Sequence, residues 1–181
     1  RVPGCVPAAG YDVHASVMSL PWLTGTTTVE QLPPPGPAYA LDPDRRAHWR
    51  ERLAALPPSR LRAGIVWGGN PENRQGLHRS MPAGVLLSAL ASLAPNLALV
   101  SLQHGQQCDE LTAPDGGGSG LAPVHCWEHA DLADTAALVA ELDLVITVDT
   151  LMAHLAGTVG RRVWTLLSFA ADWRWMTDRL D

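Results

Sequence analysis

The sequence predicts an α/β fold, a Rossmann-like doubly wound sheet of parallel strands. Short runs rich in Val, Leu and Ile alternate with helix-like segments along most of the chain. These runs lack a polar alternation, which is typical of strands that are buried on both faces. The chain has 181 residues, 46% of them hydrophobic, and this suits one globular domain with a full core.

Residues 1–40 differ from the rest of the chain in composition. They are rich in Pro, Gly and Thr and close with Pro33-Pro34-Pro35-Gly36-Pro37. We predict that they form the tail of a preceding domain and an interdomain linker. Residues 41–181 are predicted to form a Rossmann-like domain that is truncated at its carboxyl terminus, so the chain is expected to be a piece of a longer protein.

The elements of this domain follow in a regular order. Asp42-Pro43 provides a cap and a helix-compatible proline before a helix at 45–56, which Pro57-Pro58 ends. Five strands are expected at 61–67, 97–103, 122–127, 143–148 and 162–167. Helices are expected at 82–93, 106–112, 134–142 and 150–159, the last of them ended by Gly160. Residues 116–120 are interpreted as a flexible surface loop without a function.

Composition and charge exclude several classes of protein. The net charge is −5 and all 13 basic residues are Arg, so a basic nucleic-acid surface is not expected. Three cysteines without a C-x-x-C pair indicate neither a disulfide framework nor a zinc ribbon, and a cytoplasmic location is the default. No apolar stretch is long enough to span a membrane. G-x-G-x-x-G and the P-loop motif are both missing from the sequence, which disfavours dinucleotide oxidoreductases and P-loop NTPases.

Two polar loops are predicted to meet at one edge of the sheet. In the commonest order, 3-2-1-4-5, the first and fourth strands are neighbours, and ligands bind above their carboxyl ends. The loop after the first strand, residues 68–80, contains Gly68-Gly69 for close backbone approach and offers Arg74, Arg79 and Ser80 as phosphate donors. We expect the helix starting near Pro82 to direct its amino terminus at the same anion.

The fourth strand delivers Asp149, Thr150 and His154 to the start of a helix, which has unpaired N–H groups and a positive dipole end. His154 shares a helical face with Thr150. The alternative interpretation is structural: Asp149 or Thr150 merely caps the helix, His154 is a core histidine, and the arginine-rich loop is a solvated surface.

Two further groups of polar residues have the composition of ligand sites. Gln103, His104 and the helix start at Asp134-Thr135, for which Asp131 or Asp134 is the candidate cap, lie on the same edge and are positioned to contact a nucleoside. His125-Cys126-Trp127-Glu128-His129 has two histidines four residues apart, the spacing of a metal pair on a helix. These residues end a predicted strand, where that spacing separates the side chains, so no metal site is predicted.

The motifs together resemble bacterial tetratricopeptide-repeat glycosyltransferases, whose carboxyl-terminal half is similar to glycosyltransferase family 9, the heptosyltransferases. The resemblance covers nearly the whole chain, in order. It is carried by Tyr11-Asp12-Val13-His14, Met18-Ser19-Leu20-Pro21, Gly64-Ile65-Val66-Trp67-Gly68-Gly69-Asn70, Arg79-Ser80-Met81-Pro82, Val100-Ser101-Leu102-Gln103, Asp134-Thr135-Ala136-Ala137-Leu138, Val148-Asp149-Thr150, Ala153-His154-Leu155-Ala156-Gly157 and Asp172-Trp173-Arg174-Trp175.

The resemblance implies a site and a reaction. Residues 41–181 would be the nucleotide-sugar-binding, carboxyl-terminal half of a GT-B enzyme. This enzyme would transfer a sugar from a nucleoside-diphosphate sugar to an acceptor hydroxyl without a metal or a cofactor. The donor diphosphate and sugar would be held by Asn70, Arg74, Arg79, Ser80, Asp149, Thr150 and His154, and the nucleoside by Gln103, Asp134 and Thr135. Family members tend to place Lys in the loop after the first strand, where this chain has only Arg.

The resemblance also sets expectations for the parent protein. The catalytic base would lie in an amino-terminal domain outside this chain, so we expect this fragment alone to be inactive. The acceptor would be a glycan, a lipopolysaccharide or a protein, and tetratricopeptide repeats would lie upstream. Two alternatives stay open: a non-catalytic nucleotide-sugar or phosphate binding module, and a GT-B-shaped nucleotide-sugar epimerase or hydrolase.

Overall fold

The computed structural model describes residues 13–32, 40–111 and 123–176, without the side chains of residues 29, 74, 75, 94, 95 and 106. The chain divides into two compact units, Arg1–Pro34 and Pro35–Asp181. The described part of the first unit contains three short helices: η1 (Val17–Ser19), α1 (Leu20–Leu23) and η2 (Val29–Gln31). The loop predicted at 116–120 lies outside the described residues.

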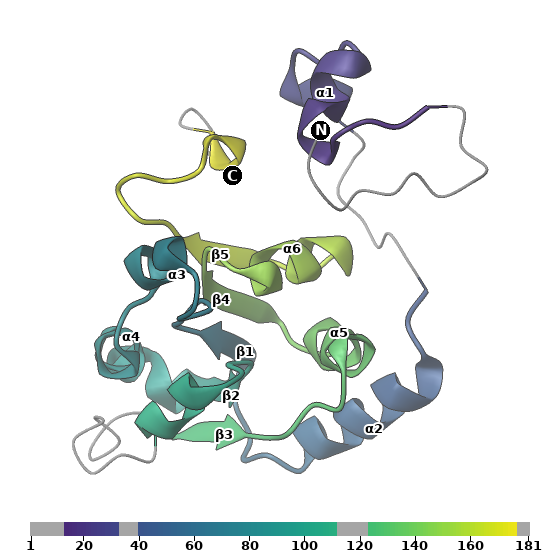
Figure 1. Ribbon diagram of the computed structural model, residues 1–181. Helices are drawn as coiled ribbons and strands as arrows, with labels where there is room; N and C mark the ends of the chain where they lie inside the picture. The colour runs from purple at the N-terminus through teal and green to yellow at the C-terminus, as the bar shows by residue number, and fades with distance from the viewer. Residues whose placement is uncertain (1–12, 33–39, 112–122, 177–181) are drawn as a thin grey trace. The chain divides into compact units, whose positions relative to one another are not determined.

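The second unit contains a five-stranded parallel sheet, and its order β3-β2-β1-β4-β5 confirms the predicted topology (Figure 1). The strands are β1 (Leu61–Val66), β2 (Leu97–Ser101), β3 (Val124–Cys126), β4 (Leu144–Val148) and β5 (Val163–Leu166). All five predicted strands are present, each shorter than the apolar run that predicted it. β1 lies between β2 and β4, so the residues that follow these three strands gather at one edge of the sheet.

Helices cover both faces of the sheet, as the doubly wound class requires (Figure 1). One face packs on α4 (Ala83–Leu90). Leucines of this helix form a buried hydrophobic cluster with Ile65 of β1 and with Trp67, which follows β1. The other face packs on α2 (Pro43–Ala54), α5 (Leu132–Ala140) and α6 (Leu151–Thr158). The larger core lies under these three helices and includes the fully buried Trp49 of α2.

The helix ends follow the capping signals in the sequence. The Asp42 side chain accepts hydrogen bonds from the Asp44 and Arg45 amides, and Pro43 is the first residue of α2. α6 ends at Thr158, and Gly160, two residues beyond it, has a φ of 73°, in the left-handed region that favours glycine. The next amide, of Arg161, donates to the Ala156 carbonyl, which closes a Schellman motif.

Three elements differ from the sequence prediction. Residues 74–79, expected to be loop, form the short helix α3 (Arg74–Arg79). Residues 106–111, expected to be α-helical, form the 3-10 helix η4 (Gln106–Leu111), and α4 continues as the 3-10 helix η3 (Ala91–Asn96). Among the described residues, the helices are all too short or too polar to cross a membrane.

Candidate functional site

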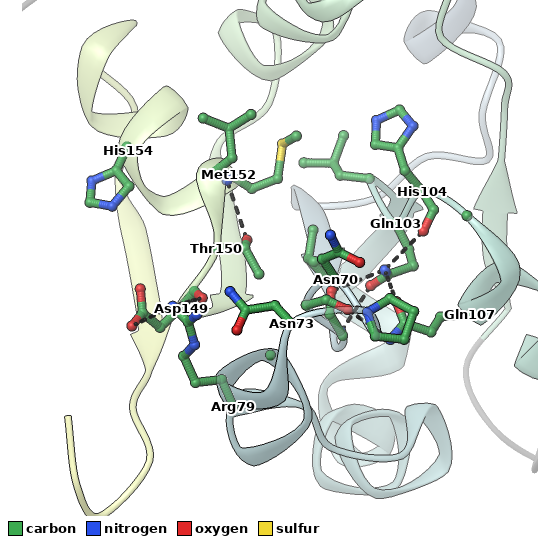
Figure 2. Close-up of a pocket in the computed structure, with 18 of the residues that line it drawn as sticks. Asn70, Asn73, Arg79, Gln103, His104, Gln107, Asp149, Thr150, Met152 and His154 are labelled. Carbon is green, nitrogen blue, oxygen red and sulfur yellow. Dashed lines mark hydrogen bonds and ion pairs between the residues drawn. The ribbon is translucent and has the colours of Figure 1, made fainter. Parts of the chain in front are cut away.

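A cleft of about 540 Å³ opens at the carboxyl edge of the sheet, above β1, β2 and β4. Most of its lining comes from three connections: the loop and helix after β1, the turn after β2, and the start of α6 after β4 (Figure 2). Arg174, after β5, also lines it. Six residues of the predicted site lie in this lining or contact it directly: Asn70, Arg79, Gln103, Asp149, Thr150 and His154. The sheet order therefore brings the two remote polar loops to one cavity.

An ion pair joins these two loops. Nη1 of Arg79 lies 3.2 Å from Oδ2 of Asp149 and donates to the Asp149 carbonyl oxygen at 3.3 Å. The Asp149 side chain is only 6% exposed, whereas 26% of the Arg79 side chain reaches solvent. A guanidinium that is held at the wall of a cleft and still partly open to it is well placed to bind an anion.

The start of α6 supplies a second positive element. The Thr150 hydroxyl accepts a hydrogen bond from the Met152 amide at 3.3 Å, so Thr150 is the N-cap of the helix. Thr150, Leu151 and Met152 all line the cleft, which places the positive end of the helix dipole at the cavity. Thr150 therefore caps the helix and also lines the cleft, although these two roles were predicted as alternatives.

His154 is exposed rather than buried, so the core-histidine interpretation is wrong. Its ring stacks on Trp175 with ring centroids 5.3 Å apart and an interplanar angle of 16°. Trp175 belongs to η5 (Trp173–Trp175), which follows β5. This stack holds η5 beside the mouth of the cleft, and Arg174 of the same turn joins the lining.

Gln103 supports the shape of the cleft. Its side-chain oxygen accepts hydrogen bonds from the Trp67 and Gly68 amides, at 3.1 and 2.9 Å, and its side-chain nitrogen donates to the Gly68 carbonyl oxygen at 3.0 Å. The same nitrogen reaches Gln107, which in turn donates to the Gly69 carbonyl oxygen. The residue predicted to contact a nucleoside therefore ties the turn after β2 to the loop after β1.

The loop after β1 is compact because it folds back on itself. The Ser80 hydroxyl donates to the Gly76 carbonyl oxygen at 2.7 Å and accepts from the Gly69 amide at 3.0 Å. Ser80 lies outside the cleft lining, and its hydroxyl forms these two loop contacts. The Arg74 side chain falls outside what the structure describes, although its backbone begins α3.

The second predicted helix start does not face the cleft. The Ala83 amide, at the start of α4, donates to the Glu110 carboxylate at 2.9 Å, and neither residue lines the cavity. A side-chain carboxylate already occupies this helix terminus. The expectation that two helix starts face one site is therefore wrong, because only the start of α6 lies at the cleft.

Asp134 and Thr135 also lie away from the cleft lining. The Asp134 carboxylate accepts from Nε1 of Trp49 at 2.9 Å and from the Ala130 amide at 3.0 Å, and the cap of α5 is Asp131. Thr135 is 1% exposed and donates to the Asp131 carbonyl oxygen. Asp134 joins α5 to α2 and to the turn before α5, and Thr135 bonds to that turn and the helix cap. Neither residue lines the cavity.

The histidines after β2 and β3 form an aromatic group at the far end of the cleft. His104 lines the cavity and meets the ring of His129 edge to face, 5.0 Å between centroids. Burial, and next the charge of His104, lower the pKa of His129, so its ring is neutral at pH 7. Among the residues that the structure describes, no group of three or more His, Cys, Asp or Glu side chains is arranged to hold a metal ion.

Several residues that line the cleft were not predicted to be site residues, among them Asn73, Gln107 and Arg174. Asn73 lies in a segment interpreted as irregular loop, and Gln107 in one interpreted as a regular helix. Arg174 stood only within the Asp172-Trp173-Arg174-Trp175 motif, whose position after the fifth strand was the signal that it reaches the carboxyl edge.

No protein-family model matches the chain. Protein FlbA of Caulobacter vibrioides is 32% identical over 152 residues, which cover 81% of this chain and 24% of FlbA. A glycosyl transferase of family 9 from Veillonella parvula is structurally similar with a TM-score of 0.55 and 15% identity, over 72% of this chain and 37% of that one. The E. coli ADP-heptose lps heptosyltransferase II is similar with a TM-score of 0.50 and 15% identity, over 76% and 42%.

The chain shares the fold of these glycosyltransferases. It spans 24% of the length of FlbA and 37% and 42% of the two solved structures. The likeness supports the α/β class and the strand-helix order that the sequence predicted.

Proposed function

We propose that this chain is the donor-binding domain of a glycosyltransferase that transfers a sugar from a nucleoside-diphosphate sugar to an acceptor hydroxyl. One observation carries the proposal. The Arg79–Asp149 contact lies beside the amino terminus of α6, so a guanidinium and a helix amino terminus line the same cleft. The shared fold with two glycosyltransferases, one of them a heptosyltransferase, supports sugar transfer over other uses of a diphosphate site.

The energetics favour recognition of the diphosphate through the arginine. A hydrogen bond to a charged group contributes about 1.5–3 kcal/mol, against roughly 0.3–1 kcal/mol for a helix dipole. Both interactions strengthen as negative charge grows on the leaving diphosphate, which is the main catalytic requirement of this reaction. These two elements can fulfil that requirement without a metal ion or a cofactor.

The reaction has a simple balance. The bond between the anomeric carbon and the diphosphate oxygen breaks, and its electron pair leaves with the nucleoside diphosphate. The acceptor oxygen bonds to the anomeric carbon, and a base takes the hydroxyl proton. The Asp149 carboxylate is nearly buried and already engaged in the contact with Arg79. We therefore assign the base to a part of the protein outside this chain.

A binding module without catalysis is the second candidate. It is favoured by the same observation, because a guanidinium and a helix amino terminus in one cleft are sufficient to bind a diphosphate without any reaction. In either case the partners are a nucleotide sugar and a glycan, a lipopolysaccharide or a protein. A transferase will release nucleoside diphosphate when donor and acceptor are both added to the full-length protein, whereas a binding module will release none.

Arg79→Ala tests the diphosphate site. We expect it to weaken binding of a nucleoside diphosphate by at least tenfold, about 1.4 kcal/mol, in isothermal titration of the full-length protein with ADP, UDP and GDP. Arg60→Ala is the matched control, because Arg60 is exposed next to the amino end of β1 and away from the cleft. Equal loss in both variants, or no loss in Arg79→Ala, would contradict the assignment.

A double variant separates lost attraction from new repulsion. Removing Arg79 leaves the Asp149 carboxylate without this partner, and that charge would itself repel a diphosphate. Arg79→Ala combined with Asp149→Asn removes both charges. If Arg79 binds the diphosphate directly, affinity stays low in the double variant. Recovery to the wild-type value would show that Arg79 acts only by neutralising Asp149.

A further inference from the structure

A second cavity, of about 630 Å³, shares the Arg79–Asp149 pair with the cleft. Its own lining comes mainly from the segment after β5, and it includes Ser168, Phe169 and Asp172. Three residues, Arg79, Asp149 and Arg174, line both this cavity and the cleft described above. A ligand bound at this shared wall can therefore extend into both spaces.

Phe169 gives the second cavity an aromatic surface. It is the only phenylalanine in the sequence and its side chain is fully exposed, in a turn after β5. An isolated exposed apolar residue is common, but this one lies beside two carboxylates in a cavity. Ligand pockets combine aromatic faces with a few polar groups in this way, and the apolar C–H face of a sugar ring packs well on an aromatic ring.

The polar side of the cavity is fixed by a local contact. The Asp172 carboxylate accepts from the Arg174 backbone amide at 3.0 Å and from Nε of Arg174 at 2.9 Å. The hydrogen bond from this amide, together with the charges of Arg174 and Arg79, lowers the pKa of Asp172. The carboxylate is ionised and accepts hydrogen bonds, as a pocket for sugar hydroxyls requires.

We propose that this second cavity binds the sugar ring of the donor, with Phe169 against its apolar face and Asp172 accepting from its hydroxyls. The inference rests on the proposed function, because it needs a diphosphate at the shared wall. The cleft continues toward Gln103, His104 and the turn after β2, which gives the nucleoside its space there. The sugar, on the other side of the diphosphate, then enters the cavity with Phe169.

The test compares nucleoside diphosphates with the nucleotide sugars that are built on them. The full-length protein is titrated with ADP, UDP and GDP and with ADP-glucose, UDP-glucose, UDP-N-acetylglucosamine and GDP-mannose. For a nucleotide that binds, Phe169→Ala should weaken the nucleotide sugar about fivefold and leave the nucleoside diphosphate unchanged. Phe169→Tyr keeps the ring and should keep the affinity. Asp172→Asn should weaken the sugar-bearing ligand selectively as well.

Trp173→Ala is the matched control. Trp173 is an aromatic residue of the same segment, 63% exposed, and it lines neither cavity. It should leave both affinities unchanged.

Three results would overturn the inference. An equal loss for both ligands in Phe169→Ala would place the ring in the nucleotide site. If Phe169→Ala binds both ligands as tightly as the wild type does, Phe169 takes no part in recognition of the donor. Weaker binding of an acceptor glycan with unchanged donor binding would make the cavity an acceptor site. If the wild-type protein binds none of the nucleoside diphosphates, the proposed function itself fails, which is a distinct outcome from a failure of Phe169→Ala alone.

Discussion

Gly76 shows how a single residue sets the shape of the site. A methyl group at this position would collide with the carbonyl oxygen of Asn70, and the backbone on both sides would have to move. From the sequence, Gly68 and Gly69 were expected to be the glycines that let the backbone approach a ligand closely. A methyl group at Gly68 would meet mainly the flexible end of Gln107, so Gly76 is the stricter requirement.

We predict that Gly76→Ala lowers the free energy of unfolding by about 1–3 kcal/mol, the usual range for overpacking, and weakens nucleoside-diphosphate binding because Asn70 and Arg79 lie on either side of it. Gly157→Ala is the control, since Gly157 is in α6 with open space around it. That change should raise the free energy of unfolding by about 0.5–1 kcal/mol. Urea denaturation measures both, and destabilisation by the two alike would contradict the steric argument.

At the scale of elements, charged contacts join α2 to α5. Nε of Arg46 and Nε of Arg50 donate to the Glu141 carboxylate at 2.7 and 3.0 Å, and the Glu141 side chain is only 11% exposed. Burial acts to raise the pKa of Glu141, but the hydrogen bonds from Arg50 and Arg46 outweigh it, and the net shift is downward. This packing leaves α5 and α6 side by side under the cleft.

Glu141→Gln should therefore destabilise the protein by about 1 kcal/mol at pH 7, a modest amount because both guanidiniums reach solvent. Since the folded-state pKa is lower than the unfolded one, the stabilisation is complete above the ordinary value of 4.5. It disappears as the pH falls through the folded-state pKa. Urea denaturation of wild type and variant should converge in acid. As the control, Glu51→Gln removes an exposed carboxylate of α2 and should leave the free energy of unfolding nearly unchanged at pH 7.

At the scale of the whole molecule, ligand binding should couple to stability. The cleft is built from connections after β1, β2 and β4, and these connections come together only in the folded sheet. A nucleoside diphosphate at 100 times its dissociation constant should therefore add about 2.7 kcal/mol to the free energy of unfolding. Thermal denaturation with ADP, UDP and GDP measures this, and Arg79→Ala should lose most of the shift. An equal shift with inorganic phosphate would argue against recognition of the nucleoside.

The sequence by itself determined the class and order of the fold. Apolar runs of strand length, buried on both faces, identify the five strands, and Asp42, Thr150 and Gly160 mark helix ends through local backbone chemistry. With the usual order of a doubly wound sheet, this was enough to bring the loops of Arg79 and Asp149 together.

Only the tertiary structure decided which polar side chains face the cleft. Ser80, Gln103 and Asp134 were all predicted ligand contacts. Ser80 and Asp134 lie outside the cleft lining and bind the loop after β1 and helix α2, whereas Gln103 lines the cleft and also binds the loop after β1. Their partners are 4, 35 and 85 residues away, and a buried polar group takes whichever partner packing supplies. A local pattern records that a residue can form a hydrogen bond, whereas the folded chain determines whether the partner is protein or ligand.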